Sequence, residues 1–171
     1  MPAEAVRAFL APLRDALGCL SSAPVHAGGR YVAGGEIGLV VNRGQPVPLA
    51  DTAFTLTAAL HCRIIETSGV LGPWRLMTSS YYYSFARMTG EELLAFHWHP
   101  HVGPTHPHLH VAAAVQGVIP HLHKRHVPTG RVALEDVIRF ALADLRAKPR
   151  RQNWKTVLAR TQEGFNRSRS W

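Results

Sequence analysis

Histidines are concentrated in one part of this chain. Nine of the 11 histidines lie between positions 97 and 126, and six of these form two alternating runs, HWHPH over residues 97–101 and HPHLH over residues 106–110. In an extended strand, residues i and i+2 share a face, so each run presents imidazoles on one side. The four residues between the runs suit a hairpin in which the histidines converge. An irregular loop is the alternative, because Pro100, Pro104 and Pro107 fall in this segment, and it also clusters the imidazoles.

Converging imidazoles can bind a metal ion. Neutral histidine is the commonest protein ligand, and three of them on a small surface can hold Zn, Ni or Fe at about 2 Å from each nitrogen. No Asp or Glu lies between Glu92 and Glu135, so acidic co-ligands are scarce here. The cofactor prediction is therefore either none or a divalent metal. The candidate ligands are His97, His99, His106, His108 and His110.

The same side chains suit acid–base chemistry, because histidine titrates near pH 6.5 and a pair can take and give a proton. RNA cleavage needs a base, an acid and a cation for the developing phosphate charge. The candidate catalytic residues are His99, His106, His108, His110 and Tyr83. Tyr81 and Tyr83 share a strand face and are suited to stacking an unpaired base or orienting a histidine, with aromatic packing on the sheet as the alternative. Surface histidines without a chemical role are the third interpretation of the block.

Positive charge is concentrated at the C-terminal end. Residues 1–120 carry seven arginines and seven acids, whereas residues 121–171 carry twelve bases and four acids and so hold the whole net charge of +8. Such asymmetry is typical of a polyanion-binding end, and a solvated basic tail is the alternative. The candidate nucleic-acid-binding residues are Lys124, Arg125, Arg131, Arg150 and Arg151.

Hydrophobic periodicity predicts an α+β fold with an antiparallel sheet, an N-terminal helix and two C-terminal helices. The predicted helices cover residues 3–17, 134–145 and 153–165, and the predicted strands cover residues 36–41, 54–66, 74–87 and 92–99. We expect a single domain over residues 1–171, with an N-terminal helix in 1–18, the sheet with its histidine-rich loop or hairpin in 28–128, and the basic helices in 133–166.

Composition excludes several classes of protein. Apolar residues make up 46% of the 171 residues and charged residues 18%, which excludes a compositionally disordered or fibrous chain. Cys19 and Cys62 form no CxxC pair, so neither a disulfide scaffold nor a cysteine zinc ribbon is supported. No stretch reaches the roughly 18 apolar residues of a membrane span, and the opening MPAE lacks the bases of a secretory signal. We therefore expect a cytoplasmic protein with no membrane partner.

A longer part of the chain resembles a known family. The segments YYYSF (81–85), ELLAFHWHP (92–100) and THPHLHV (105–111), followed by the helix from Leu134, resemble TumE-like toxins of bacterial toxin–antitoxin pairs over residues 78–146. The resemblance implies an antiparallel sheet with helices, a toxin of ribonuclease type, the histidine block as its active region, and a cognate antitoxin as a partner.

A shorter signature resembles another family. Residues 106–112, HPHLHVA, resemble the alternating histidine motif of the histidine-triad nucleotide hydrolases and transferases. That resemblance implies His108 as a nucleophile, supported by His106 and His110.

Three functions stay open on the sequence. The leading hypothesis is a toxin that binds RNA and cleaves it through the histidine-lined site. The second is a non-catalytic module that binds nucleic acid or a protein partner. The third is a histidine-dependent nucleotide phosphoesterase or a metalloenzyme.

Overall fold

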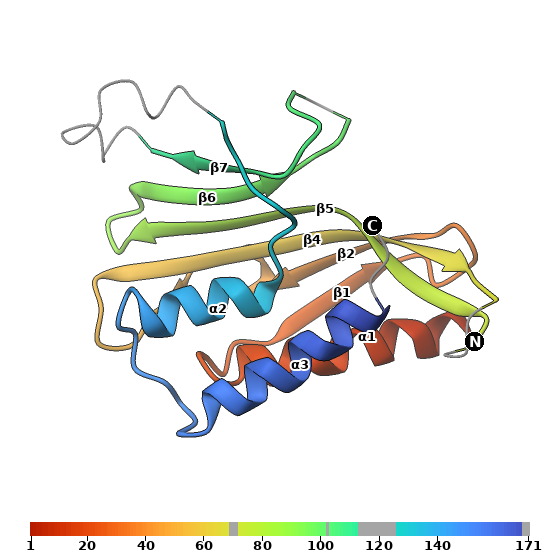
Figure 1. Ribbon diagram of the computed structural model, residues 1–171, viewed down its shortest axis with the longest axis horizontal. Helices are drawn as coiled ribbons and strands as arrows, with labels where there is room; N and C mark the ends of the chain where they lie inside the picture. Colours follow the sequence, from red (N-terminus) through yellow and green to blue (C-terminus); the bar gives the residue numbers. More distant parts are fainter. Residues whose placement is uncertain (69–71, 102, 113–125, 169–171) are drawn as a thin grey trace.

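An antiparallel sheet covered by helices on one face organises the chain (Figure 1). The computed structural model describes residues 1–68, 72–101, 103–112 and 126–168. Its elements are α1 (Pro2–Leu17), β1 (Val25–Gly29), β2 (Glu36–Val41), the 3-10 turn η1 (Asn42–Gly44), β3 (Val47–Pro48), β4 (Phe54–Glu66), β5 (Trp74–Arg87), β6 (Glu92–Trp98), β7 (His108–Val111), β8 (Val127–Pro128), α2 (Leu134–Ala143) and α3 (Trp154–Ser168). This architecture confirms the α+β prediction, with one helix before the sheet and two after it.

The sheet has a simple order. Its strands run β1-β2-β4-β5-β6-β7-β8, with β3 paired to β4 beside this path, and every pairing is antiparallel. The two longest strands, β4 and β5, have 13 and 14 residues and form its centre. Buried and less buried positions alternate along β4, as expected of a strand with one face on the core. The histidine-rich strands β6 and β7 therefore lie toward one edge, and β1 forms the other.

Amphipathic helices supply the second layer. Along α1, the buried residues Val6, Leu10, Leu13 and Leu17 recur every three or four positions, which places them on one face. α1 and α3 run along the β1 side of the molecule, whereas β7 lies at the opposite edge of the sheet (Figure 1). No helix in the described part of the chain is both long and apolar enough to cross a membrane.

Alternation along β5 separates the two faces of the sheet. Tyr81, Tyr83 and Phe85 are buried in the core, and the ring of Phe85 meets that of Phe140 on α2 edge-on, with centroids 5.4 Å apart. The residues between them, such as Tyr82, therefore point to the face that the helices do not cover. The histidines of β6 and β7 lie on this second face.

Candidate metal centre

The β6–β7 hairpin brings the two histidine runs together. His97 on β6 is the register partner of His108 on β7, and Ala95 is the partner of His110. The structure thus has the hairpin that the sequence predicts, but β6 ends at Trp98 and β7 begins at His108. The connection is consequently longer than the four residues expected, and all three prolines of the segment lie within it.

The histidines lie on the face opposite to the helices. Phe96, next to His97 in β6, points to the helices, where its ring centroid is 6.5 Å from that of Phe140. His97 points the other way, and its ring meets Tyr82 of β5 edge-on at 4.8 Å. Because register partners of antiparallel strands share a face, His108 and His110 lie on this side too.

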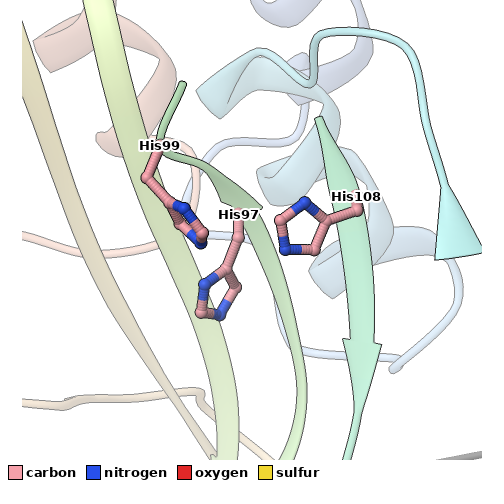
Figure 2. Close-up of side chains that lie close together, drawn as sticks. All are labelled: His97, His99 and His108. Atoms are coloured by element: carbon pink, nitrogen blue, oxygen red, sulfur yellow. The ribbon is translucent and has the colours of Figure 1, made fainter. Parts of the chain in front are cut away.

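Three of these histidines form a group that we call the inner triad: His97, His99 and His108. Their candidate ligand nitrogens all lie within 4.8 Å of one another. Figure 2 shows the three rings gathered beside β6 and β7, with His97 and His108 on neighbouring strands and His99 just beyond the end of β6. Nitrogens around a tetrahedral zinc ion lie about 3.3 Å apart when each is about 2.0 Å from the metal. The nitrogens of the inner triad would therefore have to move closer together to hold one ion.

A second group, the outer triad, comprises His108, His110 and His126. Its ligand nitrogens also lie within 4.8 Å of one another, and the ring centroid of His126 is 4.8 Å from that of His108 and 4.4 Å from that of His110. His126 is exposed and immediately precedes β8, which pairs with β7. The two triads share His108.

The backbone fixes the tautomer of His108. Its Nδ1 lies 2.9 Å from the carbonyl oxygen of His106. A carbonyl oxygen can only accept a hydrogen bond, so Nδ1 carries the proton and donates it. In the neutral ring, Nε2 then keeps its lone pair, and this nitrogen is buried with no hydrogen-bond partner among the described residues. This arrangement is typical of metal-binding histidines, whose other nitrogen is held by a carbonyl or carboxylate.

Burial keeps three of the clustered imidazoles neutral. It lowers the pKa of His97 from 6.5 to about 4, and the nearby His110 and His108 act in the same direction. Burial is also the main cause that lowers the pKa of His108 and of His110, and proximity to His126 adds to both shifts. At neutral pH these three rings are therefore unprotonated, which is the state that binds a metal.

Glu92 provides negative charge on the same face. One of its oxygens accepts hydrogen bonds from the Tyr82 hydroxyl at 2.6 Å and the Ser84 hydroxyl at 2.7 Å. Its negative charge acts to raise the pKa of both His97 and His110, against the larger effect of burial. A shift in the register between β5 and β6 explains the position of Glu92. After the shift Glu92 is the partner of Ala86, so the Glu92 side chain lies on the histidine face.

Other residues proposed from the sequence lie elsewhere. Tyr83 is 1% exposed and stacks on Tyr81 in the core, with ring centroids 4.9 Å apart, so the structure does not bring it to the histidines. Its position fits the aromatic-packing alternative. The side chain of His106 is exposed, its ring centroid is 6.0 Å from that of His108, and it belongs to neither triad.

Two of the cations predicted to bind nucleic acid, Arg131 and Arg151, also lie away from the histidine face. The Arg131 guanidinium lies 3.8 Å from the ring centroid of Trp98, which faces the helix side beside Tyr81. Arg151 forms an ion pair with Asp15 of α1 at 3.0 Å, and the backbone N–H of Arg150 donates to the carbonyl of Cys19. Lys124 and Arg125 lie outside the described residues.

Comparisons of the chain with protein-family models, with curated proteins and with solved structures found no match. The resemblances to TumE-like toxins and to the histidine-triad enzymes therefore stay predictions.

Two residues of the site, His126 and Glu92, are not among the candidate site residues predicted from the sequence. His126 belongs to the histidine block, and its clustering was a usable signal. Glu92 reaches the site through a register break between two strands, which the sequence does not reveal.

Proposed function

We propose that the protein is a metalloprotein that binds one divalent transition-metal ion through the inner triad and uses it for hydrolysis. The observation that carries this proposal is the arrangement around His108. The His106 carbonyl holds its Nδ1, and its buried Nε2 has no hydrogen-bond partner among the described residues, while His97 and His99 offer nitrogens within 4.8 Å. A metal ion would give the buried nitrogen the partner that it lacks.

The donor set indicates the class of metal. Three imidazole nitrogens suit Zn, Cu, Fe or Ni, whereas Mg and Ca prefer oxygen ligands. The lowered pKa values of His97 and His108 support binding near neutral pH, because protons compete weakly for these nitrogens. Glu92 partly balances the charge of a divalent ion from the same face.

The number of ligands indicates the type of site. Structural zinc sites are closed by four protein ligands, whereas catalytic zinc sites have three protein ligands and keep one position for water. Zinc in such a site lowers the pKa of the bound water to about 7, which supplies a hydroxide nucleophile at neutral pH. Hydrolysis is therefore the reaction class that three histidines support best.

Metal-independent RNA cleavage is less well supported as a use of this cluster. That reaction needs one protonated imidazole as the acid, and the lowered pKa values of His97, His108 and His110 make these three rings poor candidates for that role at neutral pH. Two of the cations predicted to bind nucleic acid, Arg131 and Arg151, also lie away from the histidine face. RNA binding and the toxin role stay predictions of the sequence.

Elemental mass spectrometry of the untagged protein, followed by an RNA-cleavage assay with and without a chelator, tests the proposal. We expect about one Zn, Ni, Cu or Fe ion per chain, with any hydrolysis lost in chelator and restored by one particular metal. Cleavage that persists in a metal-free sample would favour acid–base catalysis instead. Absence of both metal and cleavage would favour the non-catalytic binding module.

A further inference from the structure

The two triads compete for one nitrogen. His108 belongs to both, and its Nδ1 is engaged by the His106 carbonyl, so only Nε2 is available to a metal. A single lone pair binds one ion at a time. The inner and outer triads are therefore alternative positions for the same ion.

The two positions differ in their access to solvent. The outer triad contains His126, which is exposed, whereas both partners of His108 in the inner triad are partly buried. The Nε2 atom of His97 is buried as well. A hydrated ion arriving from solvent consequently meets His126 before it can reach His97.

The final position is favoured by the buried nitrogens. Two buried nitrogens of the inner triad, Nε2 of His97 and Nε2 of His108, have no hydrogen-bond partner in the described part of the chain. A buried polar atom without a partner is destabilising, and coordination at the inner triad can relieve both atoms. In the outer triad, the exposed His126 can be hydrated without a metal. The ion should therefore be more stable at the inner triad.

From these differences we propose that the outer triad is the loading position, from which the ion passes to the inner triad while His108 stays bound throughout. This inference rests on the proposed function. In the transfer, the nitrogens of His110 and His126 leave the ion and those of His97 and His99 replace them. Each of the four exchanging ligands binds the ion through an imidazole nitrogen, so the exchange does not change the oxidation state of the ion.

Stopped-flow mixing of the metal-free, untagged full chain with Co²⁺ tests this order of events. Visible absorbance measures uptake, and release is then followed with excess chelator. We expect His126→Ala to bind one Co²⁺ but to take it up about tenfold more slowly or worse, because one loading ligand is missing. Since His126 is exposed, this substitution should leave the fold intact.

A second variant tests the inner position. His97→Ala keeps the outer triad complete, so it should take up Co²⁺ as fast as the wild type but release it about tenfold faster or more. His101→Ala is the matched control, because His101 is an exposed histidine that belongs to neither triad. It should match the wild type in uptake and in release.

The outcomes separate this inference from the proposal on which it rests. Uptake by His126→Ala at the wild-type rate, with one ion still bound, would overturn the loading role and leave the metal site standing. Two Co²⁺ ions per chain, both lost in His108→Ala, would overturn the idea of alternative positions. A wild type that binds no Co²⁺ would overturn both proposals.

Discussion

His97 and His108 face each other across β6 and β7, with ring centroids 5.7 Å apart and ring planes inclined by only 26°. The register of one strand pair thus places two neutral imidazoles side by side on the open face of the sheet. His99 joins them from beyond the end of β6, where the chain leaves the strand. Two of the three ligands therefore come from paired strands, and sites built on strands are more precise than sites built on loops.

The neighbours His106 and His108 should behave differently on substitution. His108→Ala removes the shared ligand, so we expect calorimetric titration with Zn²⁺ to show the loss of specific binding. His106→Ala removes only an exposed side chain and keeps the carbonyl that orients His108, so its affinity should match that of the wild type. An equal loss of Zn²⁺ affinity in His106→Ala and His108→Ala would contradict the assigned set of ligands.

The free energy of unfolding of the metal-free protein should fall on acidification. An unfolded histidine takes up a proton near pH 6.5, whereas folded His97 does so only at about pH 4. Between these values the unfolded chain binds more protons, so the contribution of His97 to stability is lost as the pH falls from about 6.5 to about 4.

Urea unfolding at several pH values measures this effect. The variant His97→Asn cannot titrate there, so its stability should depend less on pH in this window than that of the wild type. The control His101→Asn should keep the wild-type dependence, since His101 lies outside both triads. If the free energy of unfolding of His97→Asn depended on pH as steeply as that of the wild type, burial would not hold His97 neutral.

The carboxylate of Glu92 should strengthen metal binding through its charge. Glu92→Gln keeps the size of the side chain but removes the negative charge, so we expect about 5- to 10-fold weaker binding, or roughly 1 kcal/mol, for a partly screened interaction. Tyr82→Phe removes one hydrogen bond to Glu92 but leaves the charge of the carboxylate, so this substitution should weaken metal binding less than Glu92→Gln does. Titration with Zn²⁺ at low and high salt measures the contribution of the Glu92 charge to metal affinity. Equal affinities for Glu92→Gln and the wild type would exclude an electrostatic role for Glu92.

Substitutions of Tyr83 separate a core role from a catalytic one. Tyr83→Phe keeps the ring that stacks on Tyr81, so metal binding and any hydrolysis should be unchanged. Tyr83→Ala removes a ring that is only 1% exposed and should lower the free energy of unfolding by about 3–5 kcal/mol. Thermal or urea unfolding with parallel activity assays measures both. Loss of activity in a stably folded Tyr83→Phe would restore the catalytic assignment.

Local patterns predicted most of the elements. β4 and β5 have the predicted bounds, because alternating apolar residues define them and the turn residues Gly72, Pro73 and Gly90 mark their ends. β1 was missed, since its sequence VHAGG contains two glycines and only one β-branched residue. Its pairing with β2 depends on contacts that the local sequence does not encode.

The site was predicted less completely than the fold. Alternation places Tyr83 and the histidines on strands, but only the position of the helices decides which face is the core. Arg151 was assigned to nucleic acid, yet it pairs with Asp15, which lies 136 residues earlier in the chain. A pairing over such a distance leaves no local signal in a single sequence.

X-ray absorption at the zinc K-edge of the zinc-loaded, untagged protein tests the central claim most directly. We predict about three imidazole nitrogens and one further light ligand at about 2.0–2.1 Å, with the imidazole signal lost in His108→Ala. Scattering from sulfur, or from oxygen ligands alone, would contradict the claim. An imidazole signal unchanged in His108→Ala would contradict it equally.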